Sequence, residues 1–201
     1  MAVKPIPEGY HALTPYLIVD GAAAAIDFYR KAFGAVEVMR MPAPNGRIGH
    51  AEVRIGDSHL MLADENPAMG YRGPKSGGEN SISLLLYVDD CDAVIERAAA
   101  AGAKVTRPPA DQFYGDRSGG LTDPFGHSWY VSTHVRDVSE EEMRRVTEEK
   151  IAEAAKKKPL TPRCPPAARQ RARERPRRSI RAGERTPVPT PSSTGPERRG
   201  R

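Results

Sequence analysis

The chain contains few cysteine, tryptophan and phenylalanine residues. Its 201 residues include two cysteines, one tryptophan and four phenylalanines. Cys91 and Cys164 do not make a disulfide framework, and no Cys-x-x-Cys pair indicates zinc or redox chemistry. No run approaches the roughly 18 apolar residues of a membrane span, and the first residues lack the apolar run of a signal peptide. We therefore expect a cytoplasmic protein.

Positive charge is scarce outside the C-terminal part of the chain. Residues 156–201 hold 15 Lys and Arg against three Glu, whereas residues 1–155 carry a net charge of −7. The overall charge of +5 therefore belongs to the tail. A mildly acidic body argues against a nucleic-acid-binding domain, because phosphate contacts need Lys and Arg clustered on a folded surface.

Hydrophobic periodicity predicts one strand, one helix and three further strands in the first part of the chain. Apolar residues spaced three and four apart predict an amphipathic helix over 22–33, which Gly34 ends. Gly56-Asp57 is typical of a two-residue hairpin turn. The expected strands are 13–19, 36–41, 48–55 and 58–63.

The same order recurs about 69 residues later. The second copy has a helix over 91–101, ended by Gly102. Its strands are expected at 81–88, from Val105, at 113–117 and at 127–133, with long loops at 66–80 and 107–111. Because neither half can bury its sheet alone, we predict that the two halves pair to form one domain with an α+β fold. Two βαβββ repeats, about 11–65 and 80–134, would form an open, curved, barrel-like sheet with helices outside. The alternative is an α+β sandwich without internal symmetry.

Alternation along the strands assigns side chains to the concave face of this sheet. Val53, Leu60 and Trp129 should face the helices, and Arg54 should pair with His59 across the hairpin. The predicted ligand-binding residues are Thr14, Tyr16, His50, Glu52, His59, Met61, Ser83, Tyr114, Asp116 and Tyr130.

Several polar groups admit two interpretations. Tyr114 and Asp116 of the Tyr-Gly-Asp-Arg segment would share one face of a strand and orient a polar ligand, or Asp116 and Arg117 would only stabilise the strand edge. His127 is expected to brace the turn that precedes it. No Ser-His-Asp, Cys-His or phosphate-loop arrangement is evident, so no catalytic residue is assigned.

Four stretches together resemble the PhnB-like branch of the vicinal oxygen chelate superfamily, the glyoxalase/bleomycin-resistance type. They are residues 14–17 with 25–34, 49–57 with 61–64, 114–117, and 123–129 with 133–134. The resemblance covers roughly residues 10–150, and the combination of YGDR with DPFGHSW makes it specific. It implies a small-molecule-binding protein of a resistance or detoxification type and a homodimer.

The resemblance also implies where a divalent metal would be held, by four side chains. The corresponding positions are Thr14, Ser83, Tyr130 and about Met61, none a good ligand for a borderline divalent metal. We therefore expect no cofactor. The alternative is a metal-dependent lyase, isomerase or dioxygenase with a displaced ligand set around His50 and Glu52, two residues that would otherwise hydrogen-bond within the pocket.

The remaining sequence predicts a helix and a tail. Ser139 with Glu142 forms a capping box that opens a helix within 136–158. Residues 159–201 contain almost no large apolar residue, a composition typical of disorder. This tail is a nucleic-acid-binding arm, an inert extension or an out-of-frame extension. The predicted domain covers 10–135.

Overall fold

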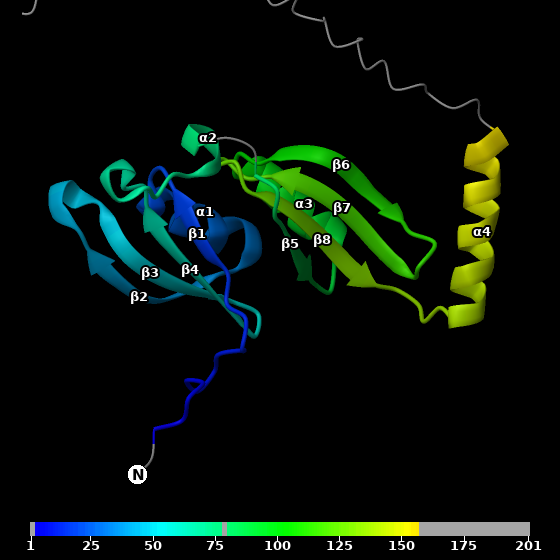
Figure 1. The fold of residues 1–201 in the computed structure, drawn as a ribbon, viewed down its shortest axis with the longest axis horizontal. Coiled ribbons are helices and arrows are strands. Elements are labelled where there is room, and N and C mark those ends of the chain that lie inside the picture. The colour runs from blue at the N-terminus through cyan, green and yellow to red at the C-terminus, as the bar shows by residue number, and fades with distance from the viewer. Residues whose placement is uncertain (1–2, 78–79, 157–201) are drawn as a thin grey trace, which may run out of the picture. The chain divides into compact units, whose positions relative to one another are not determined.

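The computed structural model describes residues 3–77 and 80–156 and contains two successive βαβββ modules (Figure 1). The first consists of β1 (Tyr16–Val19), α1 (Ala22–Phe33), β2 (Val36–Pro42), β3 (Ile48–Ile55) and β4 (Ser58–Asp64). The second consists of β5 (Ser83–Tyr87), α3 (Cys91–Ala100), β6 (Lys104–Asp111), β7 (Asp116–Thr122) and β8 (Ser128–His134). The short helices η1 (Pro44–Gly46), η2 (Pro67–Met69) and α2 (Pro74–Gly77) lie in the connections, and α4 (Glu140–Lys156) follows.

Each module folds into its own four-stranded mixed sheet. The strand orders are β1-β4-β3-β2 and β5-β8-β7-β6, with the first pair of each sheet parallel and the others antiparallel. Tyr16 pairs with Met61 in the first sheet, and Leu85 pairs with Tyr130, both 69 residues further on, in the second. The predicted α+β fold of two repeats is confirmed, and the two sheets remain open.

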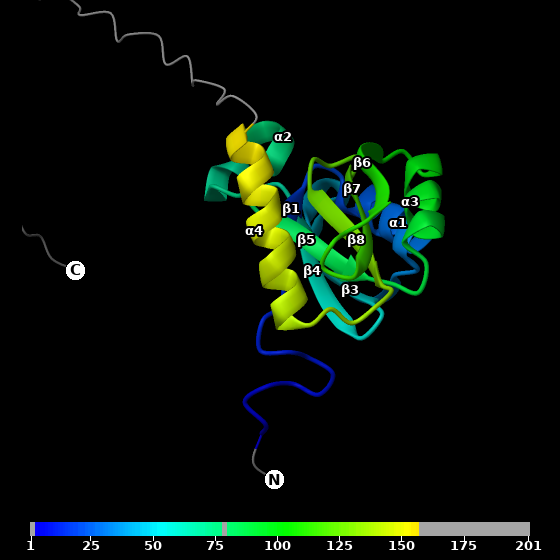
Figure 2. The same ribbon diagram turned by 90° about the vertical axis from the view of Figure 1, so that its right-hand side faces the viewer.

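The helices α1 and α3 pack against each other on one side of the sheets (Figure 2). Helix α1 buries Ile26, Phe28, Tyr29 and Phe33, the apolar face expected from the 3.6-residue period. Gly34 ends it in the left-handed conformation, with φ of 68°. The N-terminus of α1 has no cap from its own residues.

An aromatic cluster and one buried carboxylate join the two modules. Trp129 of β8 packs against Phe33 and Tyr29 of α1, with ring centroids 4.6 and 5.6 Å apart. Buried Asp123 accepts hydrogen bonds from the Tyr29 hydroxyl at 2.9 Å and the Trp129 indole N–H at 3.0 Å. Because these donors come from α1 and β8, the carboxylate ties the modules to each other.

His127 has a structural role at the same junction. Its backbone N–H donates to Asp123 at 2.9 Å, and its Nε2 lies 3.2 Å from the carbonyl oxygen of Ile18 in β1. The backbone of His127 therefore braces the turn, whereas its side chain links the turn to the first module.

The predicted assignment of side chains to the two strand faces is confirmed in the β3–β4 hairpin and in β8. Arg54 pairs with His59 and Glu52 pairs with Met61 across the β3–β4 hairpin. Trp129 is 4% exposed and lies against the helices, whereas Tyr130 is 41% exposed on the opposite face. The register assumed for β3, β4 and β8 is thus the observed one.

The prediction was wrong at the β6–β7 hairpin. Residues 107–111, expected to be a loop, complete β6, and the expected strand 113–117 is mostly the β6–β7 turn. Pro108 and Pro109 are tolerated because β6 is an edge strand with an irregular register there. Position 119 in β7 favours glycine, because the Cβ atom of any other residue there would lie 2.3 Å from Cδ1 of Ile95 in α3.

The start of the first strand also differs from the sequence prediction, whereas the last helix lies within its predicted range. Strand β1 begins at Tyr16, so Leu13, which is 85% exposed, and Thr14 precede it. Before α4 the Ser139 hydroxyl accepts from the Glu142 N–H at 3.2 Å, one half of the predicted capping box, whereas the Glu142 carboxylate accepts from Arg136 at 3.1 Å. No helix in residues 3–77 and 80–156 is long and apolar enough to cross a membrane.

Candidate functional site

A chain of hydrogen bonds crosses the concave face of the first sheet. The Tyr16 hydroxyl lies 3.0 Å from His50 Nδ1, and His50 Nε2 lies 3.0 Å from Glu52 Oε1. The other carboxylate oxygen of Glu52 accepts a short hydrogen bond from the hydroxyl of Tyr10. We call Tyr10, Tyr16, His50 and Glu52 the Glu52 network. Alternation in β1 and β3 brings Tyr16, His50 and Glu52 together, and Tyr10 reaches them from the segment before β1.

Glu52 is a buried carboxylate inside this network, with 7% of its surface exposed. The hydrogen bond from Tyr10 lowers the pKa of the Glu52 carboxyl, burial opposes that effect, and the His50 contact adds to the lowering. The same hydrogen bond raises the pKa of the Tyr10 hydroxyl. Glu52 is therefore held as a carboxylate, and its partners act as donors.

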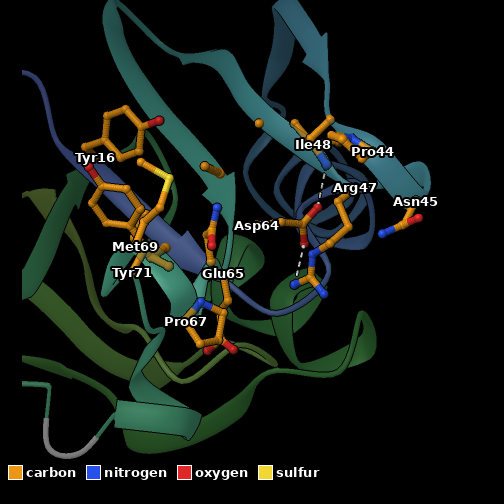
Figure 3. A pocket seen from close by; sticks show the side chains of 15 residues that line it. Tyr16, Pro44, Asn45, Arg47, Ile48, Asp64, Glu65, Pro67, Met69 and Tyr71 are labelled. Atoms are coloured by element: carbon orange, nitrogen blue, oxygen red, sulfur yellow. Dashed lines mark hydrogen bonds and ion pairs between the residues drawn. The ribbon is translucent and has the colours of Figure 1, made fainter. Parts of the chain in front are cut away.

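A cavity of about 910 Å³ lies next to the network, and Tyr16 belongs to its wall (Figure 3). The loop after β4 covers one side of the cavity and presents Met69 and Tyr71. Paired hydrogen bonds between the Asn66 and Tyr71 backbones, at 2.9 and 3.0 Å, close this loop. The loop passes so close to β1 that a Cβ atom on Gly73 would lie 2.8 Å from the Ile18 carbonyl oxygen.

The other side of the cavity carries charge. Arg47 Nη2 lies 3.7 Å from Asp64 and 3.4 Å from Asp20 (Figure 3 shows the Asp64 contact). Its side chain is 44% exposed, so the guanidinium remains accessible. In Figure 3, Arg47 and Asn45 lie opposite the group formed by Tyr16, Met69 and Tyr71. The cavity thus combines an aromatic and thioether wall with a charged wall, in which Arg47 is paired with Asp64 and Glu65 adds a second carboxylate.

Asp64 is a structural carboxylate rather than a free one. It accepts from the N–H groups of Gly21 and Ala22, which open α1, and from that of Ile48, at 2.7–2.9 Å. Burial alone raises its pKa, but these hydrogen bonds and the charge of Arg47 outweigh burial and lower it. Asp64 therefore supplies the cap that α1 lacks and fixes the cavity wall.

The second sheet carries a separate polar cluster. Buried Asp116 accepts from the Tyr87 hydroxyl at 2.8 Å, and its other oxygen lies 2.9 Å from His134 Nδ1. The second His134 nitrogen lies 3.1 Å from Asp137. The hydrogen bonds to Asp116 and Asp137 raise the pKa of the His134 imidazole. Arg117 points away from this cluster and pairs with Asp92 and Asp111.

The structure distributes the ten predicted ligand-binding residues over several places. Tyr16, His50 and Glu52 share the network, and Met61 pairs with both Tyr16 and Glu52. Thr14 and His59 border a hollow of about 380 Å³, whereas Ser83 and Tyr16 border another of about 760 Å³.

On the second sheet, Asp116 belongs to the His134 cluster, and Tyr130 carries the Arg107 guanidinium 5.1 Å from its ring centroid. The sequence interpretation placed Tyr114 on one strand face with Asp116, which is wrong, because Tyr114 lies in the β6–β7 turn. Gly115, with φ of 99°, closes that turn.

Sequence reasoning missed Tyr10, Arg47, Met69 and Tyr71. Tyr10 reaches a residue 42 positions away, and Met69 and Tyr71 belong to a segment that resembled a plain Gly- and Pro-rich loop. Of these four residues, only Arg47 lies close in sequence to predicted site residues, because it directly precedes the strand that carries His50 and Glu52.

The residues at the metal positions of the resembled family do not fit a metal. They supply two aliphatic hydroxyls, one phenol and one thioether, from Thr14, Ser83, Tyr130 and Met61, instead of imidazoles and carboxylates. Within residues 3–77 and 80–156, no three His, Cys, Asp or Glu side chains form a group able to hold an ion. His50 and Glu52 hydrogen-bond to each other and to the tyrosines.

Comparisons with known proteins agree with this fold. An uncharacterized protein of Mycobacterium bovis is 46% identical over 136 residues, 66% of this chain and 90% of the relative. The anthracycline biosynthesis protein DnrV of Streptomyces peucetius is 33% identical over 117 residues, 57% of this chain and 38% of DnrV. A PhnB protein from Bacillus cereus shares the fold, with a TM-score of 0.50, 19% identity and coverage of 61% of this chain and 99% of that one.

The family itself follows from a match along most of the two modules. The family model of the Glyoxalase/Bleomycin resistance protein/Dioxygenase superfamily matches residues 10–131. Together with the two βαβββ modules, this match shows that the chain belongs to that superfamily, the vicinal oxygen chelate superfamily.

Proposed function

We propose that the protein binds a small organic molecule on the concave face of its first sheet, without a metal at the family's usual position. The main support for this proposal is the cavity of about 910 Å³ beside the Glu52 network. Ligand sites are typically clefts of about 300–1,000 Å³ with mostly apolar walls and a few convergent polar groups. Tyr16, Met69 and Tyr71 supply the apolar wall, and Arg47 supplies the polar group.

The walls of the cavity favour a ligand with a flat apolar part and a hydrogen-bond acceptor group. Flat rings suit the Tyr16 and Tyr71 side, and an acceptor group suits the half-exposed guanidinium of Arg47 on the other side. A resistance or detoxification role, in which the protein sequesters such a molecule, agrees with a site that lacks the family's metal ligands. The relationship to an anthracycline biosynthesis protein supports a ligand from small-molecule metabolism.

A homodimer is part of the proposal. The second sheet presents Leu85, Tyr87 and Tyr130, each 41–58% exposed, on one face. Contiguous exposed apolar side chains typically mark a surface that another protein covers, and a second copy would bury them. Light scattering during size-exclusion chromatography should give twice the chain mass; a monomer at all concentrations would contradict this part of the proposal.

Binding can be tested with the protein as purified. Mass spectrometry of small molecules released on denaturation identifies the ligand, and calorimetry measures its affinity. Tyr71→Ala, in the cavity wall, should weaken binding at least about tenfold, the equivalent of 1.4 kcal/mol. Ile151→Ala, an exposed apolar truncation on α4, is the matched control. Equal affinities of the Tyr71 and Ile151 variants would show that the ligand binds elsewhere.

A cytoplasmic location and nucleic-acid binding are two further predictions that need separate experiments. A cytoplasmic location is tested by cell fractionation. Nucleic-acid binding would depend on residues 159–201, which lie outside the described residues. Salt-sensitive DNA binding that disappears on deletion of 156–201 would support that alternative.

A further inference from the structure

The N-terminal segment rests on the Glu52 network through one side chain. Residues 3–9 and 11–13 are exposed, whereas Tyr10 is half-buried. The ring of Tyr10 stacks on the imidazole of His59, with centroids 4.0 Å apart and planes inclined by 16°. Its hydroxyl donates to Glu52. Tyr10 therefore occupies a place on the concave face that an independent molecule with the same groups can occupy.

The rest of the segment is weakly attached in the structure. A turn in which the Tyr10 N–H donates to the Pro7 carbonyl at 3.2 Å positions the ring. His11 approaches Asp57 at 3.7 Å, but both side chains are more than half exposed, and such pairs contribute little. Release of Tyr10 thus requires the loss of one stacked ring and one hydrogen bond.

His59 gives an independent sign that this place is built for a ligand. Its Nδ1 is buried and has no hydrogen-bond partner among residues 3–77 and 80–156. Buried polar atoms are nearly always hydrogen-bonded, so an unpartnered one indicates a missing group. The Tyr10 ring lies over the face of the imidazole and offers no polar atom in the ring plane, where Nδ1 forms hydrogen bonds.

We propose that Glu52 and His59 form a subsite for a planar hydroxylated aromatic ring, and that Tyr10 is its internal occupant until the ligand displaces it. The subsite rests on the proposed function, because it extends the same binding face. Met61 pairs with Tyr16 at the cavity and with Glu52 at the subsite, so it connects the two. A ligand with a hydroxyaryl group would stack on His59 and donate its hydroxyl to Glu52.

Competition between Tyr10 and the ligand for the subsite determines how much the removal of Tyr10 strengthens ligand binding. The apparent dissociation constant equals the intrinsic one divided by the fraction of molecules with a free subsite. If Tyr10 is docked in about nine of ten molecules, its removal strengthens ligand binding about tenfold. Tyr10→Phe keeps the stacking and loses the hydrogen bond, so its gain should be smaller.

The test uses 2-naphthol as a hydroxyaryl probe and 2-methoxynaphthalene as a matched probe that cannot donate. The full-length Tyr10→Ala variant should bind 2-naphthol about tenfold more tightly than the unmodified protein does. Addition of Glu52→Gln should remove most of that gain, and 2-methoxynaphthalene, which cannot donate to Glu52, should bind the Tyr10→Ala variant several-fold more weakly than 2-naphthol does. Ile151→Ala, an exposed apolar truncation on α4, is the control and should change neither affinity.

A second measurement tests the docking of Tyr10 without any ligand. The stacked ring should shift the imidazole proton resonances of His59, and Tyr10→Ala or saturating 2-naphthol should remove that shift. Unchanged His59 resonances in Tyr10→Ala, or equal affinities of that variant for the two probes, would overturn the proposal. Because this test changes Tyr10 and Glu52 whereas the test of the larger cavity changes Tyr71, either proposal can fail without the other.

Discussion

Trp129 and Tyr130 are adjacent in β8 but should contribute very differently to stability. Trp129 is 4% exposed, packs on Phe33 and Tyr29, and donates to Asp123. Replacing a buried Trp by Ala costs about 3–5 kcal/mol, and Asp123 also loses a donor. Tyr130 is 41% exposed and has a guanidinium near its ring, a contact worth about 0.5–1 kcal/mol at an exposed site.

Urea unfolding can separate the two substitutions. With a slope of about 2 kcal/mol per molar urea, Trp129→Ala should lower the midpoint by about 2 M and Tyr130→Ala by less than about 0.5 M. Far-UV circular dichroism is the appropriate probe, because Trp129 is the chain's single tryptophan. Equal losses, or a larger loss for Tyr130→Ala, would refute the assignment of these side chains to opposite faces.

Further predictions concern the metal, the tail, a titration and a helix cap. Elemental analysis should find well under one Zn, Ni, Mn or Fe per chain; one ion, lost in His50→Ala, would contradict this. Deletion of residues 159–201 should shift the melting temperature by less than about 5 °C, roughly 1 kcal/mol; a larger fall would mean that the tail contributes to stability. Asp116 and Asp137 raise the His134 pKa above 6.5, so the stabilisation is complete below pH 6.5 and is lost as pH rises through the folded-state pKa. An NMR titration giving a His134 pKa at or below 6.5 would contradict it. Asp64→Ala should cost about 1–2 kcal/mol through the α1 cap; a smaller change in calorimetry would exclude that role.

The sequence predicted features that depend on local patterns. Alternation in β3 and β4, with the Gly56-Asp57 turn, placed Glu52 opposite Met61, and period-two parity separated Trp129 from Tyr130. The β6–β7 hairpin was misread because Pro108-Pro109 and Gly119-Gly120 normally indicate a loop. Here an edge position accommodates the prolines, and close packing on Ile95 favours the glycine.

The parts of the site that escaped prediction depend on contacts distant in sequence. Tyr10 follows two prolines and a glycine, which locally indicate only a turn, yet its ring reaches His59 and Glu52. Asp64 similarly caps a helix whose first residue lies 42 positions earlier. Such pairings depend on how β1, β3 and β4 are placed beside each other.

The central claim is that a small molecule binds over the first sheet between Tyr16, Met69 and Tyr71. Methionine-methyl NMR tests it directly, because the chain has methionines inside and outside the site. On titration with the ligand released from the purified protein, Met69 and Met61 should shift, whereas Met143 on α4 should not. Saturable binding that leaves Met69 and Met61 unchanged would contradict the account.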